Sequence, residues 1–112
     1  MRMIKTLLLV IIISANAWAA GFSAKDLDEA SIAKIHMAMK QGKLTAVQLT
    51  KMYIERIQAY DKRGPYLNAI VQINPKALEH AADLDRRFKE TGQFTGPLHG
   101  IPLVVKDNYD MV

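Results

Sequence analysis

The run Leu103-Val104-Val105 constrains the fold of this chain more than any other feature. It follows Ile101-Pro102, it contains no polar side chain, and it leads directly into Lys106. Successive side chains of an extended segment point to opposite faces, so a strand of this composition is apolar on both faces. Strands of that kind belong to sheets that are covered on both sides. The run therefore predicts an α/β fold in which residues 103–105 form a buried strand.

A second strand and two capped helices are predicted upstream. Residues 67–73 alternate in part and are rich in Ile and Val, as strands are. Asp28 can cap a helix that runs to about Gln41 and stops at Gly42. Thr45 begins the next helix, because it forms a T-x-x-Q capping box with the glutamine three residues later. This helix carries an apolar stripe that we expect to be core, made of Leu49, Met52, Tyr53, Ile57 and Tyr60.

A third helix is predicted between these elements and the last strand. Asn74 can serve as its N-cap, with Pro75 at the first helical position, and the helix should run to about Glu90. Gly92 is a natural C-terminal stop. Residues 92–102 hold three of the six glycines and are expected to be a loop.

These elements are too few to complete the fold they imply. Two short strands and three amphipathic helices do not cover both faces of a sheet, because each apolar stripe needs a partner layer. We therefore expect residues 20–112 to be the incomplete N-terminal part of a larger α/β domain. A complete small domain of about ninety residues is a permissible size and stays as the alternative.

Residues 1–19 are predicted to be an export signal. Arg2 and Lys5 give a basic start, residues 7–13 form an apolar core, and Ala17 and Ala19 have the A-x-A spacing of a cleavage site. A membrane anchor is the weaker alternative, because a spanning helix needs about 20 apolar residues. The chain has no cysteine, which excludes both disulfides and a lipid at the cleavage site. We expect an exported protein, periplasmic or secreted, without stable membrane association after cleavage.

Charge and histidine spacing argue against two other classes of function. The formal net charge is +4, and two of the positive charges lie in the predicted signal. The remainder is small and dispersed, so nucleic acid is not an expected partner. His36, His80 and His99 lack the spacing of metal ligands, and no metal site is predicted.

The last third of the chain carries a family resemblance. Residues 96–108, GPLHGIPLVVKDN, resemble the G-P-L-x-G-I-P-x-x-x-K-D-N segment of the amidase signature family, which comprises serine hydrolases of carboxamides. Upstream blocks at 42–45, 53–57 and 67–70 are similar to the family in the same order. The resemblance implies the N-terminal portion of a large α/β/α sandwich with a mixed central sheet. It also implies a small-molecule amide as substrate and no cofactor.

The same resemblance implies that Lys106 is the base of a Ser-cisSer-Lys triad. Neutral Lys106 would draw a proton through a bridging serine from a nucleophilic serine, which forms an acyl-enzyme and releases ammonia or an amine. Backbone N–H groups of a glycine-rich segment would hold the oxyanion. None of Ser14, Ser23 and Ser31 matches a triad position, because one lies in the signal and two precede the first helix. We expect the 112-residue chain alone to be inert.

Burial is the physical condition for such a base. A lysine pKa must fall from about 10.4 to about 7, which corresponds to roughly 4.6 kcal/mol, and full burial can supply that. Without the resemblance, Lys106 is more simply interpreted as a strand-end lysine that reaches water. Asp107 would favour the charged amine, although strand alternation should direct the two side chains to opposite faces.

Two classes of function follow from the sequence. The first is an exported amidase. The second is a non-catalytic exported binding or interaction module derived from a disrupted amidase gene. The export signal argues against one member of the family, the cytoplasmic subunit that amidates misacylated tRNA. The coding frame beyond Val112 distinguishes the two classes, because only an amidase needs the serine-bearing blocks.

Overall fold

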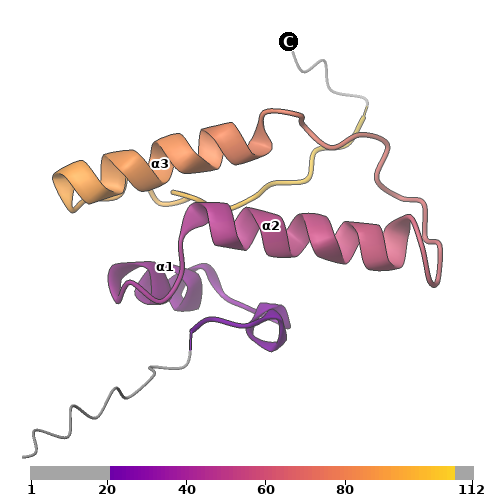
Figure 1. The fold of residues 1–112 in the computed structure, drawn as a ribbon, viewed down its shortest axis with the longest axis horizontal. Helices are drawn as coiled ribbons and strands as arrows, with labels where there is room; N and C mark the ends of the chain where they lie inside the picture. Colours follow the sequence, from indigo (N-terminus) through magenta and orange to yellow (C-terminus); the bar gives the residue numbers. More distant parts are fainter. Residues whose placement is uncertain (1–20, 108–112) are drawn as a thin grey trace, which may run out of the picture.

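The computed structural model describes residues 21–107, which form three α-helices and two short helical turns. The predicted export signal lies outside the described residues. Figure 1 shows α2 and α3 side by side, with α1 below the beginning of α2 and the second half of α3. Within residues 21–107, no helix is long and apolar enough to cross a bilayer. The elements in order are the 3-10 turn η1 (Ala24–Leu27), α1 (Ile32–Lys40), α2 (Ala46–Arg56), the π turn η2 (Ile57–Asp61) and α3 (Ala77–Thr91).

The hydrophobic core lies where α1, the first half of α2 and α3 meet. Leu49 at its centre is fully buried, and Ala81 is the residue of α3 that belongs to it. The other buried apolar residues come from η1, from α1, from the α1–α2 connection and from the first residue of α2. They are Leu27, Ile35, Ala38, Met39, Leu44 and Ala46. The core is therefore assembled mainly from residues that are close in sequence.

The capping signals fix the second helix as predicted but not the first. Thr45 Oγ1 accepts the Gln48 N–H at 3.1 Å, and Gln48 Oε1 accepts the Thr45 N–H at 2.9 Å, so the capping box is confirmed. Helix α1 is capped by Ser31, whose Oγ accepts the Lys34 N–H at 3.1 Å. The prediction of Asp28 as the cap is wrong, because Glu29 has a φ of 54° and takes the chain out of the helical path.

Helix α3 begins later than predicted and ends where predicted. Asn74 Oδ1 accepts the Lys76 N–H at 2.9 Å, two residues ahead, so it closes a turn and the helix starts at Ala77. At the other end, Gly92 has a φ of 67° and its N–H donates to the Phe88 carbonyl at 2.8 Å. The predicted glycine stop is confirmed.

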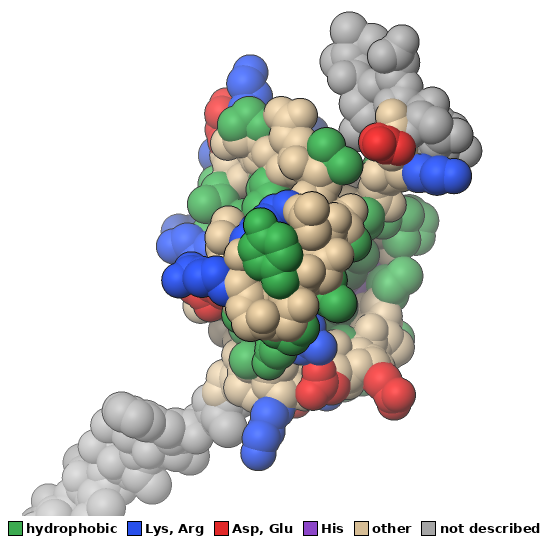
Figure 2. All heavy atoms as spheres, turned by 90° about the vertical axis from the view of Figure 1, so that its right-hand side faces the viewer, with side chains coloured by type: hydrophobic (Ala, Val, Ile, Leu, Met, Phe, Trp, Pro, Cys, Tyr) green, Lys and Arg blue, Asp and Glu red, His purple; other side chains and the backbone are tan. Residues whose placement is uncertain are grey.

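Neither predicted strand forms within residues 21–107. Residues 67–73 and 103–105 have no partner strand there, because every regular element of this part of the chain is helical. Val71 and Val104 are each 80% exposed. Figure 2, which looks at the end of the molecule where these segments run, shows hydrophobic side chains at the surface. The prediction of two strands is wrong for the described residues, and the mixed sheet stays a prediction.

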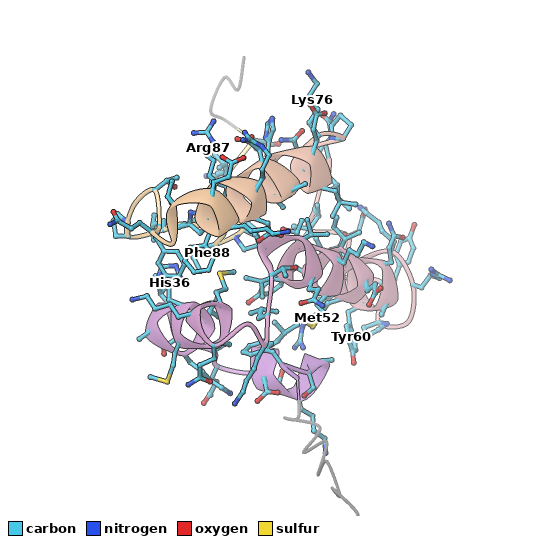
Figure 3. All side chains as sticks on the ribbon, turned by 60° about the vertical axis from the view of Figure 1, so that its left-hand side comes forward. His36, Met52, Tyr60, Lys76, Arg87 and Phe88 are labelled. Carbon is cyan, nitrogen blue, oxygen red and sulfur yellow. The ribbon has the colours of Figure 1, made fainter. Side chains whose placement is uncertain are left out.

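The apolar stripe of the second helix is core at its beginning only. Met52 and Tyr53 pack against the core, whereas Tyr60 is 51% exposed. Figure 3 shows Met52 and Tyr60 on the side of the helix that faces away from α3. The first elements of the chain cover this side near Met52 but not at η2, where the Arg56 guanidinium lies 5.5 Å from the Tyr60 ring centre. The prediction that Tyr60 is core is therefore wrong.

Candidate functional site

The start of α2 is held by a carboxylate from α3. Asp85 Oδ1 accepts the Ala46 N–H at 2.7 Å, and Asp85 Oδ2 accepts the Val47 N–H at 3.0 Å. These amides are two of the donors that a helix leaves unsatisfied at its N-terminus. A carboxylate is also favoured there by the helix dipole. Asp85 therefore fixes α3 against the beginning of α2, on which the run GPLHGIP rests.

Gly100, in the middle of that run, lies directly on this junction. Its φ is +69°, and a Cβ at this position would lie 3.0 Å from both Ala46 Cβ and Met39 Cε. Glycine is thus required by the left-handed backbone and by the close contact. Two backbone bonds close the turn around it, from the His99 N–H to the Gly96 carbonyl and from the Ile101 N–H to the Leu98 carbonyl, both at 3.1 Å.

Two histidines from distant parts of the sequence meet at the same turn. His99 is 3% exposed, and its Nδ1 accepts the Thr95 N–H at 3.2 Å. The Thr95 hydroxyl lies 3.1 Å from the same nitrogen. From α1, His36 Nε2 donates to the His99 carbonyl at 2.9 Å. We call residues 95–101 the anchored turn.

Aromatic rings enclose the His99 side chain. Phe94 stacks on it with ring centres 4.8 Å apart and an interplanar angle of 19°, and Phe88 lies at 6.0 Å. Phe94 also contacts His36, at 4.4 Å between ring centres. Figure 3 shows His36 on α1 and Phe88 on α3 facing the space between the two helices. Burial lowers the pKa of His99 and the nearby His36 lowers it further, while Asp85 acts in the opposite direction.

Lys106, the predicted catalytic base, lies beyond the anchored turn. Ile101 packs against the core, but Leu103 and Val105 are 70% and 45% exposed, and Lys106 is exposed as well. The burial on which its role depends is therefore not supplied by residues 21–107, and the role stays a prediction. Asp107 is also exposed.

The two serines within the described residues have structural roles. Ser23 Oγ donates to Asp26 at 2.7 Å, and Ser31 caps α1. Ser23, Asp26 and Lys34 form one cluster, in which the bonds from Ser23 and then the Lys34 amine lower the pKa of Asp26 to about 2. Ser14 lies outside the described residues. Among residues 21–107, no group of three or more His, Asp or Glu side chains is arranged to hold a metal ion.

Sequence reasoning missed two residues: His36, which binds the anchored turn, and Asp85, which holds the start of α2 on which the turn rests. Asp85 is 39 residues from the amide that it caps, and His36 is 63 residues from the carbonyl that it binds. Neither residue lies in a local capping pattern, so no signal in the sequence marks it. For His99, the lack of ligand spacing predicts a satisfied core or surface position, and the structure places it in the core.

Comparisons with known proteins agree with this picture. Residues 48–112 match the family model Amidase. An amidase homologue of Schizosaccharomyces pombe is 40% identical over 83 residues, which is 74% of this chain and 14% of that protein. A chain of the mitochondrial glutamyl-tRNA(Gln) amidotransferase of Rattus norvegicus is 36% identical over 80 residues, covering 70% of this chain and 14% of that one.

The fold is similar to that of a solved amidase. The native peptide amidase from Stenotrophomonas maltophilia superposes with a TM-score of 0.72 at 40% identity, over 80% of this chain and 18% of that one. The chain belongs to the amidase family and matches its N-terminal portion. It spans 14–18% of the length of these relatives.

Proposed function

We propose that this chain forms the N-terminal part of an amidase, which hydrolyses a carboxamide to an acid and ammonia or an amine through a serine acyl-enzyme. The observation that carries the proposal is the family match over residues 48–112, because this range includes the run that ends in Lys106-Asp107-Asn108. The likeness to a peptide amidase over 80% of the chain supports the same reaction class.

Lys106 is the proposed general base. The anchored turn fixes where the run begins, because Gly100 is pressed against Ala46 and Met39 and Ile101 packs on the core. The run beyond it carries three exposed apolar side chains that a further layer of an amidase domain would cover. Once covered, the amine would be neutral and would accept the proton of a serine hydroxyl. The two serines would come from the rest of the domain.

The proposed substrate is a small amide, with peptide amides as the first class to examine because of the likeness to a peptide amidase. The proposed location is outside the cytoplasm, on the strength of the signal pattern in residues 1–19. An export signal is incompatible with amidation of tRNA in the cytoplasm. The activity named for the amidotransferase relative is therefore not part of the proposed function. No nucleic acid partner and no cofactor are part of the proposal.

The test is amide hydrolysis by the protein encoded by the full reading frame, read past Val112. Release of ammonia or amine is measured with aliphatic, aromatic and peptide amides. Lys106→Ala should lower kcat by about 10³-fold or more, because it removes the general base. Lys76→Ala is the matched control, since Figure 3 shows Lys76 pointing into solvent at the start of α3.

Two results would contradict the proposal. Near wild-type turnover in Lys106→Ala would remove Lys106 from the mechanism. A reading frame that stops after Val112, in a protein that hydrolyses none of the amides, would favour the non-catalytic exported module.

A further inference from the structure

The hydrogen bonds of His99 define its protonation state. The Thr95 backbone N–H can only donate, and it points at His99 Nδ1 at 3.2 Å. That nitrogen must therefore accept, which leaves the ring neutral with its proton on Nε2. The Thr95 hydroxyl, 3.1 Å from the same nitrogen, is then a second donor. The anchored turn is closed by an imidazole that has to remain uncharged.

His36 holds the same turn in a different way. Its Nε2 donates to the His99 carbonyl at 2.9 Å. An imidazole with a proton on Nε2 can donate this bond both as the neutral and as the charged ring, and the charge strengthens the bond. The turn thus combines one histidine whose protonation removes a bond with another whose protonation leaves its bond in place.

The surroundings oppose a charge on His99. Its side chain is buried between Phe94 and Phe88. The groups that face this cluster are His36 and Lys40 from α1 and Asp85 from α3, with the Lys40 amine 5.3 Å from the Phe94 ring centre. Asp85 already accepts the Ala46 and Val47 amides. A proton gained by His99 would be buried, and burial and the neighbouring His36 oppose it more strongly than the Asp85 carboxylate favours it.

We propose that His99 is a positioning residue that holds the anchored turn in place only while its imidazole is neutral. Protonation would place an N–H of Nδ1 against the Thr95 N–H. The Thr95 hydroxyl can rotate to accept this new proton, but the Thr95 amide loses its acceptor. Acid would therefore loosen the turn from which the run to Lys106 starts. The consequence for catalysis rests on the proposed function, whereas the hold on the turn does not.

The pH range follows from the direction of the pKa change. Because burial lowers the pKa of His99 below its value in the unfolded chain, the unfolded form binds more protons between these two values. The turn is most stable above about pH 6.5. Its opening constant then rises by up to about tenfold per pH unit as the pH falls toward the lowered pKa, and becomes constant below it.

Amide hydrogen exchange in the whole chain tests the proposal. Protection of the Thr95, His99 and Ile101 amides, corrected for intrinsic exchange, is followed from about pH 7.5 to about pH 4.5, across the range in which histidine titrates. Leu49 in the core is the internal reference. His99→Asn supplies an acceptor that does not titrate near these pH values, so its protection should be independent of pH. His80→Asn, at an exposed position of α3, should behave as the wild type.

Two further variants keep the test decisive if His99→Asn does not fold. Thr95→Val removes the hydroxyl and keeps the Thr95 backbone N–H as the donor to His99 Nδ1, so the loss of protection of the turn in acid should persist in this variant. His36→Gln keeps a donor to the His99 carbonyl but removes a neighbouring charge, so the titration should move to higher pH. Protection of the turn that does not change with pH, or that changes equally in His99→Asn, would overturn the proposal.

Activity separates this inference from the proposed function. In the full-length enzyme, His99→Asn should remove the acid limb of kcat/KM that belongs to His99 and leave kcat near its wild-type value at neutral pH. An inactive full-length protein whose anchored turn still loosens in acid would contradict only the proposed function. An active enzyme with a pH-independent turn would contradict only the role of His99.

Discussion

The helical core and the apolar run after the anchored turn have similar side chains and opposite surroundings. Leu49 in α2 is fully buried, whereas Val104 is 80% exposed. Helices satisfy their own backbone groups, so residues near in sequence can build α1, α2 and the contacts between them. An extended run needs a neighbouring strand and a covering layer, and residues 21–107 provide neither. The contrast separates what the described residues of this amidase-family chain complete by themselves, the helical core, from what they leave uncovered, the apolar run.

The largest expected effect tests the difference in burial between the helical core and the apolar run. Leu49→Ala should lower the free energy of unfolding of the chain by about 2–5 kcal/mol, because it removes a fully buried side chain from the core. Val104→Ala should change it by less than about 0.5 kcal/mol, as exposed substitutions do. Urea unfolding monitored by circular dichroism measures both. Equal effects would mean that the run is covered in solution.

The next effect concerns the contact that joins the run to the core. Gly100→Ala should lower the free energy of unfolding by about 2–4 kcal/mol, because it adds left-handed backbone strain and a clash with Ala46 and Met39. Gly92→Ala is the matched control, since it has a φ of +67° with nothing within 4 Å of its Cβ position. Gly92→Ala should lower the free energy of unfolding by about 1 kcal/mol, because it adds only the left-handed backbone strain. Similar losses of stability in the two variants would show that the Ala46 and Met39 side chains move aside easily for the added methyl group.

A smaller effect is expected at the α2–α3 junction. Asp85→Ala should lower the free energy of unfolding by about 1–2 kcal/mol, because the Ala46 and Val47 amides lose the carboxylate that caps them. Asp83→Ala, which removes only exposed ion pairs with Arg86 and Arg87, should cost about 0.5 kcal/mol or less. Thermal unfolding of the two variants at one pH makes the comparison. A loss at Asp83 as large as that at Asp85 would contradict the capping role.

The smallest effect concerns the loop before the first extended segment. Asp61 accepts the Ala69 N–H at 2.6 Å and bonds to Ile70 and Lys62. Burial alone would raise the pKa of Asp61, but these bonds outweigh it and the pKa is lowered. The stability that Asp61 gives to this loop is therefore fully present above about pH 3.8, the pKa of the carboxyl in the unfolded chain. It is lost as the pH falls through the lowered pKa of the folded chain. Exchange of the Ala69 amide should show this acid loss, and Asp61→Asn should abolish it.

Sequence predicted the parts of this fold that are decided by nearby residues. The Thr45–Gln48 capping box and the Gly92 stop need only a few positions, and both are confirmed. Asp28 failed as a cap because a single left-handed residue, Glu29, lies between it and α1. The two predicted strands failed because propensity describes a side chain, while a strand also requires a partner backbone.

The candidate site divides along the same line. The motif itself marked the glycine-rich turn and Lys106, but its supports came from elsewhere in the chain. His36 and Asp85 act across 63 and 39 residues, and neither has a local pattern that would identify it. Residues 21–107 leave Lys106 exposed, so the sequence motif could name the residue and not its surroundings.

The bond from Asp85 to the start of α2 also has a consequence for the order of events during synthesis. The carboxylate is incorporated 39 residues after the Ala46 amide that it binds. At the usual speed of translation this corresponds to about 2–8 s. During that interval the first turn of the nascent helix is capped only by its own Thr45 and by water, and its final position is set when the later segment leaves the ribosome.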